Sequence, residues 1–176
     1  MLLAGLAGLF FSRRVGCPLW WRSHKNSLRL GRSTYITVAL GLSVVIGNSA
    51  FNFAFYMADP DQALRVAPWI VLLNPERAIA LSFRAALNEE MLFRFFLFPL
   101  VTWAILYFKQ SQKVSLVIGG LISSTAFGFI HGAGFITAFL VGLALVYIYY
   151  QRGLLSAMAV HFLADAVPFL LISMMQ

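Results

Sequence analysis

Charged residues are scarce in this chain of 176 residues. Only 11% of the residues are charged, whereas 61% are hydrophobic. A soluble domain of this size cannot bury so much apolar surface, because a small globule leaves a large fraction of its chain facing solvent. The scarcity of charge therefore excludes an ordinary soluble domain and predicts a protein that lies in a lipid bilayer.

Cysteine is almost absent as well. The single residue, Cys17, excludes an intrachain disulfide and any cysteine-rich metal site. The sequence also has no internal repeat and no low-complexity tract, so nothing in it predicts an additional soluble domain.

The long apolar runs predict the fold class. In lipid, every backbone N–H and C=O must be satisfied within the protein, which restricts the chain to helices or a closed barrel. The runs extend well beyond ten residues without alternating, so we predict an all-α, polytopic transmembrane bundle of about five to six membrane segments. The full spans expected are residues 33–57, 77–108, 114–131, 135–150 and 154–175.

The first eleven residues are apolar but too short to cross a hydrocarbon core of about 30 Å. They form either an interfacial segment or part of a span. We divide the chain into residues 1–76, with N-terminal membrane segments and a basic linker, and residues 77–176, which form the core helices.

The chain carries a net charge of +7. Its basic residues lie next to hydrophobic spans, so we expect them to contact anionic membrane lipids and not nucleic acid. Six lie around the first linker: Arg13, Arg14, Arg22, Lys25, Arg29 and Arg32. The positive-inside rule places this linker in the cytoplasm. We expect a multi-pass protein of a bacterial-type cytoplasmic membrane.

Three groups of polar residues interrupt the spans. Ionisable residues in transmembrane helices are energetically costly, and those that persist usually mark a functional site. In chain order, the groups are Glu89 with Glu90 and Arg94, Phe127 with His131, and His161 with Asp165.

The spacing within the first group separates two roles. Glu90 and Arg94 are four residues apart with the acid first, which favours an ion pair along one helix face and is usually structural. Glu89 is rotated by about 100° from Glu90, so it can face a different neighbour. Such a carboxylate suits a general base or acid.

The other two groups admit both structural and functional interpretations. Phe127 precedes His131 by one turn and can fix its imidazole, although a histidine at a span end is often only an interfacial residue. His161 and Asp165 share a helix face, where the carboxylate can orient the imidazole or help bind an ion. The conjunction of three polar faces in one apolar chain favours a shared site.

Weaker polar signals are expected to serve helix packing. We predict interhelical hydrogen bonds from Asn48 and Asn52, and from the run that contains Ser123 and Ser124. Gly128 and Gly132 form a small-xxx-small pair that predicts close approach of two helices.

The three groups, in this order, resemble the motifs of the CPBP family of intramembrane proteases. This family contains the CAAX prenyl endopeptidases and the bacteriocin-processing or abortive-infection proteins. The matching motifs are Glu89-Glu90-x-x-x-Arg94, Phe127-x-x-x-His131 and His161-x-x-x-Asp165. The resemblance covers a little over half of the chain.

The resemblance implies a conical cavity within the bilayer. There Glu89 would activate the attacking water, and His131 would help to hold it. His161 and Asp165 would stabilise the tetrahedral oxyanion or complete the site. Glu90 and Arg94 would brace the first motif.

The resemblance leaves the cofactor open. Glu89, His131, His161 and Asp165 have the chemistry to bind one divalent metal, with zinc as the favoured ion. The same four groups can also support a metal-free Glu/His mechanism. Asp165 stands where the CAAX proteases carry Asn. An ionised Asp cannot donate to an oxyanion, which favours a metal-binding or His-orienting role, or a protonated Asp165.

We therefore expect a CAAX-protease-like intramembrane (metallo)endopeptidase. Its substrate would be a membrane-associated peptide or the C-terminal tail of a protein. The alternative is a non-catalytic membrane protein that confers bacteriocin immunity or scaffolds a partner. A proton relay or small transporter is weaker, since no inverted repeat is present. One feature fits poorly: His161 lies only about 12 Å from the start of its span, so residue counting does not bring it level with Glu89 and His131.

Overall fold

The computed structural model describes residues 2–20 and 32–175. These residues form helices and turns without any strand, which confirms the all-α prediction. Three of the basic linker residues, Arg22, Lys25 and Arg29, lie outside the described residues.

Eleven helical elements follow one another in the described part of the chain. They are α1 (Leu2–Val15), α2 (Arg32–Ala58), α3 (Pro60–Val66), the 3₁₀ helix η1 (Pro68–Leu72), α4 (Pro75–Glu89), the π-helix η2 (Glu90–Leu97), α5 (Phe98–Tyr107), α6 (Gln112–Phe129), the 3₁₀ turn η3 (Gly132–Gly134), α7 (Phe135–Arg152) and α8 (Leu154–Ser173).

Four helical stretches of the described residues are long and apolar enough to cross a membrane. They are Arg32–Ala58, Pro75–Tyr107, Gly132–Arg152 and Leu154–Ser173. The fifth expected span forms α6, with 18 residues. The N-terminal segment forms α1, whose 14 residues are too few for a hydrocarbon core of about 30 Å.

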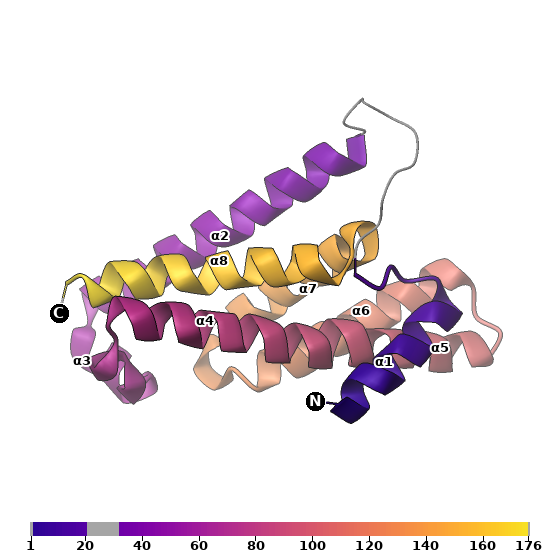
Figure 1. Cartoon of the computed structure of the whole chain (residues 1–176), viewed down its shortest axis with the longest axis horizontal. Helices are drawn as coiled ribbons and strands as arrows, with labels where there is room; N and C mark the ends of the chain where they lie inside the picture. The colour runs from indigo at the N-terminus through magenta and orange to yellow at the C-terminus, as the bar shows by residue number, and fades with distance from the viewer. Residues whose placement is uncertain (1, 21–31, 176) are drawn as a thin grey trace.

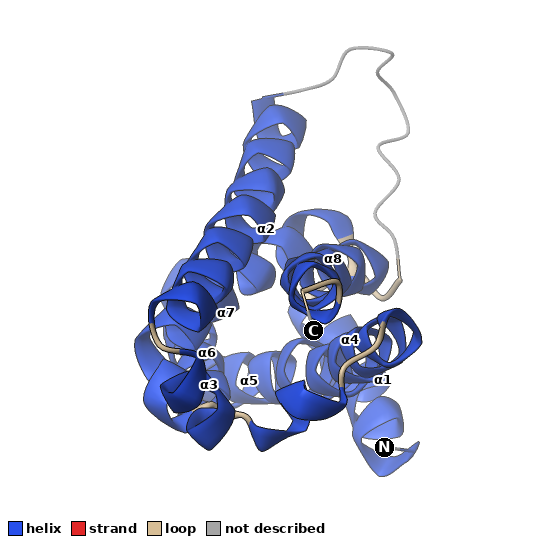
Figure 2. Ribbon diagram, turned by 90° about the vertical axis from the view of Figure 1, so that its left-hand side faces the viewer, coloured by secondary structure: helices blue, strands red, loops and turns tan. Residues whose placement is uncertain are grey.

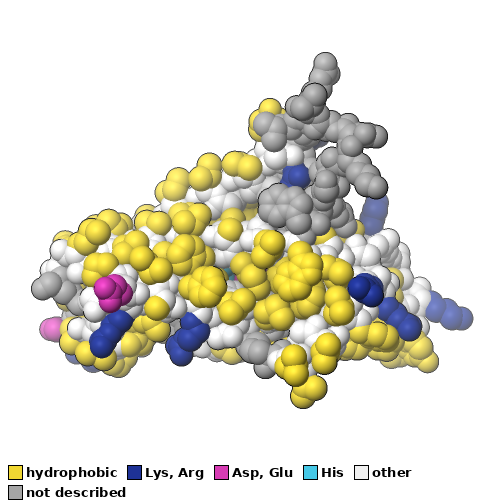
Figure 3. Space-filling model, viewed as in Figure 1, with side chains coloured by type: hydrophobic (Ala, Val, Ile, Leu, Met, Phe, Trp, Pro, Cys, Tyr) yellow, Lys and Arg dark blue, Asp and Glu magenta, His cyan; other side chains and the backbone are white. Residues whose placement is uncertain are grey.

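Helix α8 is the centre of the bundle. It lies antiparallel beside α4 and also contacts α2 and α7 (Figure 1). The N-terminal end of α2 leans away from α8, as the view along the bundle shows (Figure 2). Apolar side chains cover most of the visible outer surface (Figure 3). Such a surface is unfavourable in water and favourable in lipid, so the chain is an integral membrane protein.

The connection between α2 and α4 has strong local signals. The side chain of Asp59 caps α3 by accepting from the N–H of Gln62 at 2.8 Å. Asn74 caps α4 in the same way, accepting from the N–H of Arg77 at 2.8 Å. Pro75 occupies the first turn of α4, where no intrahelical N–H bond is lost.

A π-helix continues α4 and lies next to Pro99. Proline has no N–H to donate to the carbonyl of Phe95 four residues earlier. One residue before Pro99, the N–H of Phe98 donates to the carbonyl of Phe93, five residues back, which is the hydrogen-bond pattern of a π-helix. The Ser12 hydroxyl of α1 donates to the Phe95 carbonyl at 3.3 Å, and the hydroxyls of Ser12 and Tyr149 are 3.0 Å apart. These bonds attach α1 to η2. Gly8 of α1 allows the two helices to approach closely, because an added Cβ there would lie 2.6 Å from the carbonyl oxygen of Phe95.

One end of the bundle is filled by a tightly packed core, and we call it the closed end. Phe98, Leu145, Ile148, Tyr149 and Leu154 are all at most 1% exposed there. The opposite end, where α3 and η1 lie (Figure 1), is called the open end because a cavity lies between its helices.

Candidate active site

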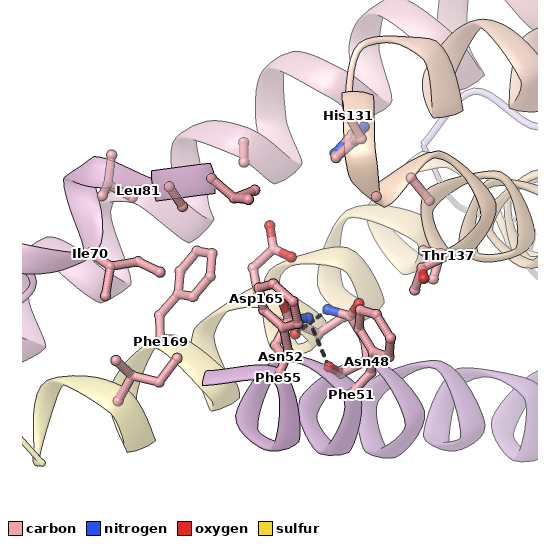
Figure 4. Close-up of a pocket in the computed structure, with 18 of the residues that line it drawn as sticks. Asn48, Phe51, Asn52, Phe55, Ile70, Leu81, His131, Thr137, Asp165 and Phe169 are labelled. Carbon is pink, nitrogen blue, oxygen red and sulfur yellow. Dashed lines mark hydrogen bonds between the residues drawn. The ribbon is translucent and has the colours of Figure 1, made fainter. Parts of the chain in front are cut away.

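The open end contains a cavity of about 530 Å³. Its wall comes from α2, α3, η1, α4, α8, and the adjoining ends of α6 and α7 with the turn between them. Glu89, Phe127, His131, His161 and Asp165 all line it. In Figure 4, Asp165 lies between His131 on one side and the α2 residues on the other. The structure therefore brings residues from all three motifs to one cavity.

Glu89 lies at the centre of this group. Its Oε2 atom is 3.8 Å from His131 Nε2 and 3.7 Å from His161 Nε2. This oxygen has no hydrogen-bond partner among the described residues. Both separations exceed the usual hydrogen-bond length of about 2.7–3.2 Å, and a water molecule can bridge such gaps.

These contacts also resolve the problem of depth. Glu89 is the last residue of α4, and His131 follows the end of α6 at the same level. The turn between α6 and α7 therefore stops near the middle of the continuous α4–α5 stretch, as Figure 1 shows. His161 meets Glu89 only eight residues into α8 because α8 begins well short of the end of the bundle where α5 and α6 meet (Figure 1).

His131 is oriented by its own helix. Its Nδ1 atom is 2.8 Å from the carbonyl oxygen of Phe127. A carbonyl only accepts, so Nδ1 carries the proton and Nε2 of the neutral ring presents its lone pair toward Glu89. The Phe127 ring lies 4.6 Å from the imidazole, between centroids. The predicted role of Phe127 beside His131 is thus seen in both backbone and side-chain contacts.

His161 faces carboxylates on both sides of its ring. Its Nδ1 is 2.8 Å from Glu90 Oε1, and its Nε2 is 3.4 Å from Asp165 Oδ2. The bond to Glu90 was not foreseen, since the sequence predicted only a pair between Glu90 and Arg94. It joins the first motif directly to the third and fixes the direction of Nε2 toward the cavity.

The predicted ion pair between Glu90 and Arg94 is present and entirely buried. Arg94 Nη1 lies 3.1 Å from Glu90 Oε1, and both side chains are 0% exposed. The guanidinium carbon is 4.0 Å from the centre of the Phe127 ring, which adds a cation–π contact. Phe127 also packs edge-on against His161. This ring therefore contacts side chains from all three motifs.

The weaker signals were partly correct. Asn48 donates to the carbonyl of Ala164 in α8 at 2.9 Å, and Ser123 donates to the carbonyl of Phe93 in η2 at 2.7 Å, so both link helices as predicted. Asn52 instead bonds the carbonyl of Asn48 in its own helix, so its prediction was wrong.

The glycine pair was also only half right. Gly128 approaches Phe135 closely, so that an added Cβ would lie 2.9 Å from its ring. Gly132 has open space around it and a φ of 55°, a left-handed conformation that favours glycine in the turn.

The metal prediction can be compared with the arrangement of donors. Among residues 2–20 and 32–175, no group of three or more His, Cys, Asp or Glu side chains has the arrangement of a metal site. We therefore derive no step through a metal, and zinc binding stays a prediction.

Comparison with known proteins gives one match. A family model described as type II CAAX prenyl endopeptidase Rce1-like matches residues 68–167, more than half of the chain. The matched stretch runs from η1 into α8 and includes all three motifs. Searches of curated proteins and of solved structures found no significant match.

Proposed function

Since the chain belongs to the Rce1-like family of type II CAAX prenyl endopeptidases, we propose that it is an intramembrane endopeptidase in which Glu89 activates water. Its substrate is a membrane-associated peptide or the C-terminal tail of a protein. The observation that carries this proposal is the position of Glu89 Oε2, which faces two imidazole nitrogens at 3.7 and 3.8 Å inside one cavity.

The geometry supports a simple sequence of proton transfers. The attacking water binds between Glu89 Oε2 and His131 Nε2, each of which accepts a hydrogen bond from it. Glu89 takes a proton as the water oxygen attacks the scissile carbonyl carbon. The same proton then passes to the leaving amine as the C–N bond breaks. The products are a new carboxylic acid and a new amine, which exchange a proton to become a carboxylate and an ammonium group.

His161 is the proposed donor to the developing oxyanion. In the proposed mechanism the ring is an imidazolium flanked by two carboxylates: Nδ1–H donates to Glu90, and the second N–H, on Nε2, is directed into the cavity. Asp165 lies 3.4 Å from Nε2 and orients the ring without donating itself. A preorganised N–H donor in a site with little water is a strong source of transition-state stabilisation.

The decisive experiment compares purified wild type with Glu89→Gln on a library of membrane-tethered peptides. We expect cleavage by the wild type and its loss in Glu89→Gln, because the amide cannot accept the proton. Glu76→Gln is the matched control, since Glu76 is an exposed residue in the first turn of α4 and does not line the cavity. Equal cleavage by both variants would exclude Glu89 as the base.

The same preparations separate the alternative of a non-catalytic scaffold. A scaffold protein cleaves nothing and keeps its immunity or partner-binding effect in Glu89→Gln. An endopeptidase loses both cleavage and any effect that depends on it.

Metal dependence needs a separate measurement. Metal analysis of active protein, followed by chelation and zinc add-back, distinguishes the two mechanisms. Activity that survives complete metal removal supports the Glu/His mechanism, whereas activity lost on chelation and restored by zinc supports the metal.

A further inference from the structure

The two ends of the bundle differ sharply in charge. The closed end carries six described cations: Arg13, Arg14, Arg32, Lys109, Lys113 and Arg152. Hydrogen bonds from Ser33 to Gln151 and from Arg152 to Thr34 place the start of α2 beside the end of α7 there. The open end carries three cations and three acids: Arg65, Arg77, Arg84, Asp59, Asp61 and Glu76. The remaining three acids of the chain belong to the site.

This asymmetry orients the protein in the membrane. Cytoplasmic loops carry an excess of Lys and Arg, and acidic residues contribute little to the rule. Six cations at one end against three at the other place the closed end in the cytoplasm. Figure 3 shows acidic side chains on the visible face only at the end where α3 lies.

The cavity lies in the other half of the molecule. Its lining comes from the C-terminal half of α2, from α3 and η1, from α4 up to Glu89, from the part of α8 that begins at His161, and from the ends of α6 and α7 beside their turn. Val66 and Trp69, which line it at the open end, are 55% and 40% exposed. Between the cavity and the cytoplasmic face, the packed core around Phe98 and Tyr149 fills the bundle.

The turn between α6 and α7 also lies in this half and is apolar at its surface. Phe129, Ile130 and Ile136 are 71%, 61% and 72% exposed. The turn stops at the level of Glu89, and apolar side chains exposed at that depth suit lipid and not water. One border of the cavity is therefore formed by a turn that ends inside the bilayer.

We propose that the site opens toward the membrane face opposite the basic turns, so that its substrates are membrane-anchored peptides whose scissile bond lies in the non-cytoplasmic half of the bilayer. The direction of opening follows from charge and packing. The statement about substrates rests on the proposed function.

Cysteine labelling in intact cells of a bacterial host tests the direction without requiring activity. Cys17→Ala provides the background, since Cys17 is the single cysteine. Val66→Cys reports on the mouth of the cavity, and Gln110→Cys, in the exposed turn between α5 and α6, is the matched control.

With a membrane-impermeant maleimide, Val66→Cys should react in intact cells and Gln110→Cys only after permeabilisation. Reaction of Val66→Cys only after permeabilisation overturns the proposal. If Val66→Cys fails to fold or to react in either condition, the same labelling is done on Asp61→Cys, in the first turn of α3. The outcomes that support or overturn the proposal are the same for this variant.

A second experiment tests the substrates. One cleavable peptide is tethered to a single-span anchor in both orientations and co-expressed with the protein. We expect cleavage of the peptide on the non-cytoplasmic side and at least a tenfold lower yield for the opposite orientation. Preferred cleavage on the cytoplasmic side overturns the proposal. Absence of cleavage in both orientations, with the expected labelling pattern, counts against the proposed function and leaves the direction of opening standing.

Discussion

The closed and open ends of this bundle are built from the same long helices but are packed in opposite ways. At the closed end, Phe98, Ile148 and Leu154 interlock with almost no exposed surface. At the open end, a cavity of about 530 Å³ separates the helices. The difference arises because α6 and α7 turn back at the level of Glu89, so nothing from this pair fills the space beyond. The site lies at the boundary where dense packing stops.

Polar groups differ between the two regions as well. At the closed end, the Thr102 hydroxyl bonds the carbonyl of Phe98 in its own helix, and Ser12 pairs with Tyr149. At the boundary, ionisable groups share partners, so that His161 meets Glu90 and Asp165 at once. We therefore expect residues of the closed end to determine stability and residues at the boundary to determine the cleavage rate.

The largest expected effect separates these two outcomes at Glu89. Glu89→Gln should lower the cleavage rate by about 10²–10⁴-fold, the usual contribution of a general acid–base group. Thermal stability in detergent should stay near that of the wild type, since the side chain is 25% exposed and makes no hydrogen bond through Oε2 within the described part. If Glu89→Gln lost both activity and fold, Glu89 would not be a residue that governs cleavage without governing stability.

Arg94 should affect both properties. Arg94→Leu leaves Glu90 buried without its cation, which should lower the free energy of unfolding by about 3–5 kcal/mol. The double variant Arg94→Leu/Glu90→Leu should recover much of this stability in denaturant titrations, because no lone charge remains. Its cleavage rate should stay about 10–100-fold low, since His161 loses the acceptor at Nδ1. Full recovery of cleavage would show that Glu90 does not position His161.

A closed-end core residue should change stability alone. Ile148→Ala should lower the free energy of unfolding by about 2–5 kcal/mol, because Ile148 is 0% exposed and its loss creates a cavity. The cleavage rate per folded molecule should be unchanged. Ile136→Ala, at a position that is 72% exposed, is the control and should change stability little. A fall in the rate constant of folded Ile148→Ala would contradict the division of roles.

The smallest effect is expected from a single hydroxyl. Tyr149→Phe removes the partner of Ser12 while keeping the ring against Phe98. The free energy of unfolding should fall by about 0.5–1.5 kcal/mol, the net value of one hydrogen bond. Activity should be retained. An unchanged stability curve would mean that this bond contributes nothing to the attachment of α1.

Much of the helical framework follows from local sequence. The predicted span 33–57 forms Arg32–Ala58, and the predicted span 154–175 forms Leu154–Ser173. Apolar runs bounded by charged residues, Gly and Pro determine such limits locally. The π-helix was not predicted, because its context includes Pro99 together with a hydroxyl from α1, far away in the sequence.

The sequence predicted which residues form the site but not which of them bond to one another. The motif spacing identified Glu89, His131 and His161 because each interrupts an apolar span. Spacing along one helix says nothing about how α4 is rotated relative to α8, so the bond between Glu90 and His161 required the structure. The depth of the turn between α6 and α7 was equally hidden, since apolar sequence does not show where a helix pair turns back.

The hydrogen bond between Ser12 and Phe95 has a consequence for biosynthesis. Ser12 leaves the ribosome 83 residues before the carbonyl that it satisfies. Helix α1 can dock only after this acceptor has been inserted, and the lipid interior offers no water to occupy that carbonyl meanwhile. We therefore expect docking of the first helix to be among the last steps of assembly.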